Sequence, residues 1–246
     1  MTIAIGRKCL IIVQKDLSVG NNKIIILNIN NLNFISSRLI DFVYADMIYD
    51  NVDFTWIHYY WRQLKENGIF IVQTDYHTVA NVKLEMDKLS KSNFINWVIY
   101  KQEWGGCPQR GFPQKHDDIL IYSKGKNFKW YGDRIQIPKV TAGTKLDRKG
   151  TGLKTPCSVF DDLGSFSTLS KERIKDVDVG KCIQWQKPIK LLQRLMLPFL
   201  DAGDLVVDPF CGTATSGVVA KELGCDYIGI ELDKKIYGIA KNRLGC

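Results

Sequence analysis

The chain has 246 residues and a formal net charge of +8. This length is enough for one large α/β domain, and no apolar run approaches the roughly 20 residues that a membrane span needs. We therefore expect no membrane-spanning segment, a cytoplasmic location and a polyanionic partner, because phosphate contacts favour a basic protein. The seven cysteines form no C-x-x-C pair and the three histidines lack ligand spacing, so we expect reduced thiols and no metal site.

The N-terminal part of the chain contains two segments that we expect to be strands. Residues 1–12 open on a short apolar stretch, which predicts an edge strand better than a targeting segment. Residues 39–45 are strongly apolar and are followed directly by Asp46. This pattern predicts a buried strand with a carboxylate at its end.

A helix and another strand are expected next. Apolar side chains recur at helical spacing over residues 57–64, residues 65–68 contain the helix-ending Asn-Gly pair, and residues 69–72 are apolar again. Beyond these elements, residues 125–181 are polar and contain several glycines, which indicates a loop region or a mobile linker. Its basic side chains are candidates for phosphate contacts: Arg134, Lys139, Lys145, Arg148, Lys149, Lys154, Lys171, Arg173 and Lys175.

An amphipathic helix is expected after Gln186-Lys187-Pro188. Five apolar residues fall on one face of this segment, so the helix should pack on a sheet. They are Leu191, Leu192, Leu195, Met196 and Phe199.

A strand, loop, helix and second strand follow toward the C-terminus. Residues 205–207 form an apolar strand that ends at Asp208, residues 217–223 have a helical pattern, and the apolar run from Tyr227 ends at Glu231. Such a junction can hold a small polar ligand, and a carboxylate ending the second strand suits the two hydroxyls of a ribose. Because the chain lacks a G-x-G-x-x-G phosphate motif there, S-adenosylmethionine fits better than a dinucleotide.

The run Asp208-Pro209-Phe210-Cys211-Gly212-Thr213-Ala214-Thr215 resembles the D-P-F-x-G-x-G-T loop of the amino-group DNA methyltransferases. Gln186-Lys187-Pro188 resembles the Q-K-P of that family, and Asp46-Met47-Ile48-Tyr49 stands where the family has D-P-P-Y. The resemblance continues through Lys171-Glu172-Arg173 and Lys115-His116-Asp117, and covers roughly residues 22–244. The acceptor motif precedes the cofactor motif, which is the order of the beta group.

The resemblance implies an α/β fold of the Rossmann-like S-adenosylmethionine-dependent methyltransferase type, with a mostly parallel twisted sheet and helices on both faces. It implies one domain, residues 1–246. Within it, residues 22–124 would be the catalytic half, residues 125–181 a linker and DNA-recognition region, and residues 182–246 the cofactor-binding half.

The resemblance also assigns roles to single residues. The Asp46 carboxylate and the main-chain carbonyl of Met47 would accept the two N–H groups of an exocyclic amine, and Tyr49 would stack on the extruded base. Lys187 would pair with the carboxylate of the cofactor. The other implied residues for binding S-adenosylmethionine are Asp208, Pro209, Phe210, Gly212, Thr213, Thr215 and Glu231.

Two departures from the family pattern matter for the chemistry. Met47 and Ile48 replace both prolines of the acceptor motif, so the turn loses two fixed φ angles while every carbonyl is kept. Ala214 replaces a glycine, which is unfavourable if that position needs a positive φ.

Within this family an Asp at the start of the acceptor motif favours adenine, so the resemblance implies a DNA adenine-N6 methyltransferase that acts on a flipped adenine of double-stranded DNA. Cytosine-N4 methylation, an RNA target and a catalytically inactive DNA-binding relative are the alternatives. A nucleophilic cysteine is not expected, since Cys107-Pro108-Gln109 lies outside the strand-end motif. A restriction nuclease as partner, and the choice between monomer and homodimer, stay open.

Overall fold

The structure, a computed structural model, describes residues 40–47, 53–102, 106–164, 166–175, 180–183 and 185–245, and the backbone of residues 9–13. Ile48 and Tyr49 of the acceptor motif lie outside the described residues, as do residues 22–39 at the start of the expected catalytic half. Of that motif, the structure therefore describes Asp46 and Met47.

The centre of the fold is an eight-stranded sheet with the strand order β1-β10-β9-β2-β3-β5-β4-β8. The strands of this sheet are β1 (Cys9–Val13), β2 (Ile40–Asp46), β3 (Leu64–Thr74), β4 (Ser92–Lys101), β5 (His116–Lys124), β8 (Val159–Phe160), β9 (Leu205–Asp208) and β10 (Asp226–Glu231). The helices are α1 (Thr55–Gln63), α2 (Val79–Asp87), α3 (Ile189–Met196), α4 (Thr215–Glu222) and α5 (Lys234–Leu244). All neighbouring strands run parallel except β5, which is antiparallel to both β3 and β4. The expected α/β fold with a mostly parallel sheet is confirmed.

The two faces of the sheet carry separate hydrophobic clusters. One cluster joins the side chains of α3, α4 and α5 to alternate residues of the central strands, such as Phe42 and Ile71. The other joins α1 and α2 to the intervening residues, such as Val43 and Val72. Because side chains alternate between the faces of a strand, each strand contributes to both clusters, and the sheet is covered on both sides.

The two parts of the chain that the sequence links to acceptor and cofactor meet in the middle of the sheet. β2 pairs in parallel with β9, with Phe42 opposite Val206 and Val43 opposite Val207. β2 also pairs with β3, so that Asp46 lies opposite Gln73. Since neighbouring strands lie about 4.8 Å apart, the carboxyl ends of β9, β2 and β3 form one continuous edge.

Several element predictions are confirmed, with shifts at their ends. The amphipathic helix is α3, and its Leu191, Leu192, Leu195 and Met196 are buried against the sheet. The first strand, β1, pairs with β10 at an edge of the sheet as expected. The helix expected to end over residues 65–68 ends earlier, at Gln63, because residues from Leu64 onward already pair with β2.

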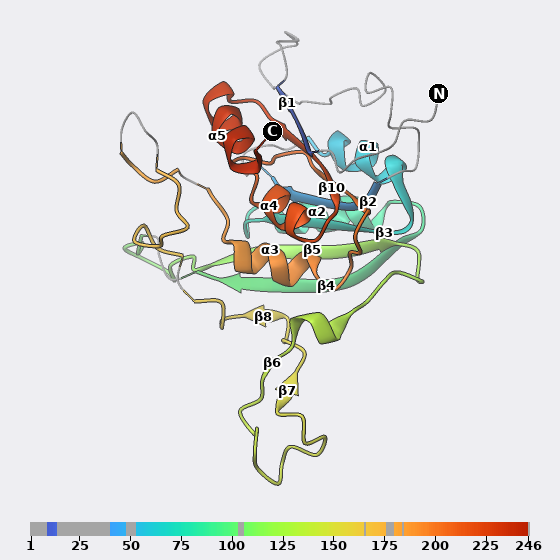
Figure 1. The fold of residues 1–246 in the computed structure, drawn as a ribbon, viewed down its shortest axis with the longest axis vertical. Coiled ribbons are helices and arrows are strands. Elements are labelled where there is room, and N and C mark those ends of the chain that lie inside the picture. Colours follow the sequence, from blue (N-terminus) through green and yellow to red (C-terminus); the bar gives the residue numbers. More distant parts are fainter. Residues whose placement is uncertain are drawn as a thin grey trace.

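A small two-stranded ribbon stands apart from the main sheet. Strands β6 (Ile137–Pro138) and β7 (Leu153–Lys154) pair within residues 136–156, which we call the finger and which extends downward from the body in Figure 1. Its side chains Lys145, Arg148, Lys149 and Lys154 are exposed.

The base of the finger is tied to the turn between α3 and β9. The Tyr131 amide donates to the carbonyl of Pro198 over 2.7 Å, and the Tyr131 hydroxyl donates to Asp201 over 2.8 Å. Arg134 donates to the carbonyl of Leu200 over 2.7 Å. These bonds join the segment that leads into the finger to the segment that leads into the central strand β9.

In the part of the chain that the structure describes, no helix is both long and apolar enough to cross a bilayer. The same residues contain no group of three or more His, Cys, Asp or Glu side chains arranged to hold a metal ion.

Candidate active site

Asp46 lies at the carboxyl end of β2, where the alternation of side chains decides which way it points. Phe42 and Tyr44 belong to the cluster under α3, so Asp46, two residues further on, shares their face. By the same alternation, Gln73 follows Ile71 of β3 on this face and Asp117 precedes Ile119 of β5. Three polar side chains thus gather beside the segment that leads into α3.

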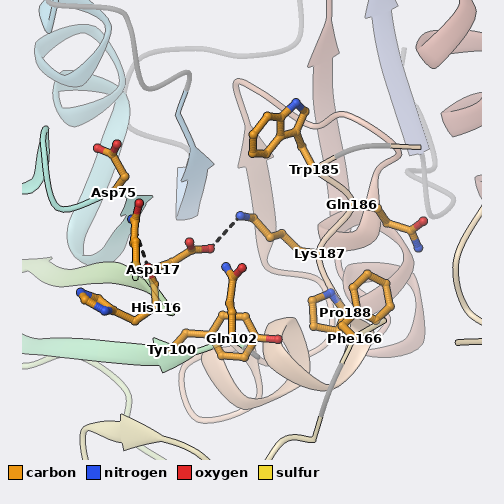
Figure 2. Close-up of a pocket in the computed structure, with 11 residues that line it drawn as sticks. Asp75, Tyr100, Gln102, His116, Asp117, Phe166, Trp185, Gln186, Lys187 and Pro188 are labelled. Carbon is orange, nitrogen blue, oxygen red and sulfur yellow. Dashed lines mark hydrogen bonds and ion pairs between the residues drawn. The ribbon is translucent and has the colours of Figure 1, made fainter. Parts of the chain in front are cut away.

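That segment supplies a cation. The Lys187 ammonium lies 3.2 Å from Oδ1 of Asp46 and donates to Oδ2 of Asp117 over 2.9 Å. Figure 2 shows the Lys187 side chain reaching from its own segment toward Asp117. The lysine before the helix therefore connects to two carboxylates that come from β2 and β5.

Gln73 links this group to the buried part of the sheet. Its Nε2 donates to Oδ2 of Asp117 over 2.6 Å, and its Oε1 accepts a hydrogen bond from the Tyr44 hydroxyl over 2.7 Å. Gln73 is fully buried, and Tyr44 is 2% exposed. Buried amides need such partners, and both ends of this amide have one.

Met47 occupies the position of the first family proline and makes a contact that a proline cannot make. Its amide N–H donates to the carbonyl of Gln73 over 3.2 Å, which extends the pairing of β2 with β3 one residue past Asp46. The Met47 side chain is 2% exposed and packs in the cluster under α1 and α2. A hydrogen bond and a buried side chain thus restrain the backbone where the family uses a ring.

Asp208, at the end of β9, is surrounded by neutral donors. Its Oδ1 accepts the Phe210 amide over 3.0 Å and its Oδ2 accepts the Ser216 hydroxyl. Burial raises the pKa of Asp208 to about 7, the hydrogen bonds from Ser216 and Phe210 oppose the rise, and the charges of Asp46 and Glu231 add to it. Asp208 therefore shapes the loop after β9 and lies within the field of Asp46.

Glu231, at the end of β10, holds the other side of the same loop. Its Oε1 accepts the amides of Leu232 and Asp233, each over 2.8 Å. Burial raises the pKa of Glu231, while hydrogen bonds from the backbone of Asp233, Leu232 and Gly212 lower it by a smaller amount. Gly212 has a φ of +52°, and a Cβ placed on it would meet open space. The loop backbone is thus open to a ligand at Gly212.

The remaining loop residues are placed as follows. Pro209 is buried, and the half-buried Phe210 ring lies edge-on to Trp56 with a centroid distance of 5.1 Å. Thr213 and Thr215 both accept hydrogen bonds from Arg243, at 3.3 and 2.9 Å. The Thr215 hydroxyl donates to the carbonyl of Lys187 over 3.0 Å, so the first turn of α4 holds the lysine segment directly.

The Lys171-Glu172-Arg173 segment secures the approach to Lys187. Gln186 donates to the carbonyl of Glu172 over 2.9 Å, and the Glu172 carboxylate accepts the Ile189 amide at the start of α3 over 2.7 Å. Arg173 is 8% exposed and donates to the carbonyl of Gln186 over 3.3 Å. The prediction that Arg173 contacts phosphate is therefore wrong, because its guanidinium serves this buried joint.

A cavity of about 300 Å³ opens beside the Lys187–Asp117 ion pair (Figure 2). Its aromatic lining is Tyr100, Phe166 and Trp185, and its polar lining includes Gln102 and His116. It lies at the carboxyl ends of β3 and β4, on the opposite side of Asp46 from the Asp208 loop. The edge of the sheet thus offers two adjoining sites, with Asp46 and Lys187 between them.

The family resemblance gave roles to Asp46, Met47, Lys187 and the Asp208 loop, and the structure places them along one edge of the sheet. Sequence reasoning missed Gln73 and gave no role to Asp117. The sequence did contain a signal for both residues. Each lies two positions from an apolar residue that faces α3, and side chains alternate between the two faces of a strand.

Comparison with known proteins now identifies the family. The sequence profile of the family described as DNA methylase matches residues 43–242, which is most of the chain. The chain belongs to this family. The match includes both Asp46 and the Asp208 loop.

Related methylases also match over much of the chain. Type II methyltransferase M.HinfI of Haemophilus influenzae is 49% identical over 202 residues, which is 80% of this chain and 51% of that protein. M.HpaI of Haemophilus parainfluenzae is 28% identical over 190 residues, or 77% of this chain and 57% of that protein. The chain therefore spans little more than half the length of these two relatives.

Solved structures share the fold. The PvuII DNA methyltransferase, described as cytosine-N4-specific, has a TM-score of 0.63 and 15% identity, covering 86% of this chain and 82% of that one. The crystal structure of an M1.HpyAVI–SAM complex has a TM-score of 0.59 and 18% identity, covering 88% and 93%. At these identities the likeness concerns the fold.

Proposed function

We propose that this chain transfers a methyl group from S-adenosylmethionine to the exocyclic N6 amine of an adenine that is extruded from double-stranded DNA. One observation carries the proposal. Asp46 and the Asp208 loop end neighbouring strands, and Lys187, from the segment held by the loop's helix, reaches Asp46. An acceptor carboxylate and an open cofactor loop thus share one edge of the sheet, which is where ligands bind in folds of this type.

The residues of the loop fit a nucleoside with a cationic sulfonium. The charges of Asp46 and Glu231 both act on Asp208, and these two carboxylates favour a positive ligand beside the loop. The proposed binding residues are Asp208, Pro209, Phe210, Gly212, Thr213, Thr215, Glu231 and Lys187. When bound, S-adenosylmethionine supplies an electrophilic methyl group.

On the acceptor side, Asp46 and the carbonyl of Met47 would each accept one N–H of the target amine. An aromatic amine is a weak nucleophile because its lone pair is delocalised into the ring, and two acceptors help to localise that pair and direct it at the methyl group. Tyr49 is proposed to stack on the base.

Radiolabelled S-adenosylmethionine and unmethylated duplex DNA, followed by hydrolysis to nucleosides, test the proposal. Label in N6-methyladenine supports it, whereas label in N4-methylcytosine overturns the choice of base. Binding of S-adenosylmethionine and DNA without any transfer shows an inactive relative. An RNA duplex or single strand in parallel tests the nucleic acid class.

Asp46→Ala should lower the rate of methyl transfer by about 100- to 1,000-fold, because the amine loses its charged acceptor. Binding of S-adenosylmethionine, measured by calorimetry, should persist. Asp161→Ala, which removes an exposed carboxylate, is the matched control. An Asp46→Ala protein with the wild-type rate would overturn the role of Asp46.

The exposed basic side chains of the finger are proposed to contact DNA phosphates. Replacing Lys145 and Arg148 by Ala should weaken DNA binding and flatten the dependence of log K on log salt by about 0.9 for each lost contact. The control is Lys88→Ala, since Lys88 is exposed after α2 and outside the finger. If the wild type, the variant lacking Lys145 and Arg148, and Lys88→Ala have equal slopes of log K against log salt, the finger does not contact DNA.

A further inference from the structure

We infer that Asp117 and Gln73 are positioning residues, which hold the Lys187 ammonium against Asp46 and so fix the direction in which Asp46 accepts the target amine. The inference rests on the proposed function. It concerns two side chains that the family motifs of acceptor and cofactor do not include.

The geometry forms a continuous chain of contacts. Tyr44 donates to Gln73 over 2.7 Å, Gln73 donates to Asp117 over 2.6 Å, and Lys187 donates to Asp117 over 2.9 Å. The ammonium then lies 3.2 Å from Asp46. The contacts thus lead from Gln73 on β3 to Asp117 on β5, then to Lys187 before α3, and end at Asp46 on β2.

Burial limits the positions that these side chains can adopt. The side chains of Lys187, Asp46 and Asp117 are only 10%, 16% and 9% exposed, and Gln73 is fully buried. A lysine has a long, flexible side chain, so one carboxylate would leave its ammonium several positions. Two carboxylates on different strands define one position between them.

The charges explain why Asp117 matters to Asp46. Two partly buried carboxylates on one face repel each other, and the ammonium between them offsets that repulsion. Its charge also lies 3.2 Å from Oδ1 of Asp46, which favours one orientation of the carboxylate about its Cβ–Cγ bond. The lone pairs that meet the target amine therefore keep one orientation, and orientation is what a transfer between two bound reactants requires.

Gln73 acts on the Asp46 carboxylate through two routes. Its side chain fixes Asp117, and its carbonyl accepts the Met47 amide directly after Asp46. The side-chain route can be removed alone by Gln73→Met, which has a similar volume and keeps the main-chain carbonyl.

Single-turnover methyl transfer tests the inference. Asp117→Asn should lower the rate of transfer by about 10- to 100-fold, because the ammonium loses one charged partner. The KM for DNA should change by less than about threefold, since no side chain proposed to contact DNA is altered. Gln73→Met should show the same pattern with a smaller decrease.

Asp118→Asn is the matched control. Asp118 is the next residue of β5, is 3% exposed and accepts a hydrogen bond from the Trp97 indole over 2.7 Å on the other face of the strand. The same substitution there perturbs a buried carboxylate of the same strand without touching Lys187. An equal rate decrease in both variants would reduce Asp117 to a structural residue and overturn the inference.

A double-mutant cycle provides a readout that a structural role would not give. If Asp117 acts through Lys187, then Asp117→Asn should have almost no further effect in a Lys187→Met background. Fully additive effects, or a wild-type rate for Asp117→Asn, would overturn the inference.

Crystal structures of the wild type and Asp117→Asn decide the point independently of turnover. We expect the Lys187 ammonium to leave its position beside Asp46 in the variant, and an unchanged contact would overturn the inference. A wild type that transfers no methyl group at all would instead overturn the proposed function, so the two failures are distinguishable.

Discussion

Asp46 and Asp208 end neighbouring strands of one sheet, yet their surroundings are opposite. Asp46 faces an ammonium at 3.2 Å, whereas Asp208 is held by a backbone amide and a serine hydroxyl. Burial raises the pKa of Asp208 to about 7 because neutral donors only partly replace water. The position at a strand end thus brings a carboxylate to the site, while the elements that face the carboxylate decide its role.

The largest expected effect concerns the backbone that carries Asp46. Met47→Ala should lower the free energy of unfolding by about 2–5 kcal/mol, because it leaves a cavity where a buried side chain now packs. Methyl transfer should fall as well, since the packing restrains the turn that lacks its prolines.

Urea unfolding and transfer assays measure both effects of Met47→Ala. Met47→Leu, which nearly conserves volume, is the control and should cost less than about 1.5 kcal/mol. If Met47→Ala kept wild-type stability and activity, packing would not be what replaces the proline.

A second prediction concerns the pH dependence that Asp208 confers. Below about pH 4 both folded and unfolded chains keep the proton of Asp208. Between about pH 4 and 7 the unfolded chain loses it while the folded chain retains it, so stability falls as pH rises. Asp208→Asn lacks this contribution, and its stability relative to the wild type should increase by up to about 1.4 kcal/mol per pH unit over that range.

Urea unfolding of the wild type and Asp208→Asn from pH 4 to pH 8 measures this difference. The difference in free energy of unfolding between the two proteins should become constant above about pH 7, where the folded chain has also lost the proton. A difference that stays the same at every pH would contradict the buried environment described for Asp208.

The smallest effect is expected at Ala214, which has a φ of +56° and is fully buried. The position thus has the positive φ that favours glycine. Ala214→Gly relieves about 1 kcal/mol of backbone strain but loses a buried methyl group and gains freedom in the unfolded chain. The net change in thermal stability should stay within about 1 kcal/mol.

Ala214→Val is the contrasting variant, because a β-branched side chain is strongly disfavoured at positive φ. It should lower the melting temperature markedly. Similar melting temperatures for the glycine and valine variants would show that the loop relaxes at this position.

The sequence predicted the strands β2, β9 and β10 and the helix α3, because their apolar patterns are local and regular. It assigned Asp46 and the Asp208 loop to one active site only through the family resemblance, and their common edge depends on the pairing of β2 with β9. It did not predict the contact of Lys187 with Asp117. That contact depends on the place of β5 next to β3, a long-range pairing that no local pattern contains.

Charge patterns were the less reliable guide. Arg173 and Lys145 look alike in the sequence, yet Arg173 is buried against Gln186 and Lys145 is exposed on the finger. The composition of a segment gives its charge but not its burial, because burial depends on which distant element covers it. The end of α1 was misplaced for a similar reason, since the pairing of Leu64 with β2 overrides the local helical pattern.

The attachment of the finger has a thermodynamic consequence. Its base and the start of β9 share one joint, built by Tyr131 and Arg134 on the turn from Pro198 to Asp201. A ligand that shifts this joint therefore also shifts the segment that precedes the Asp208 loop. Linkage requires reciprocity: whatever factor a ligand on the finger applies to affinity at the loop, a ligand at the loop applies to the finger.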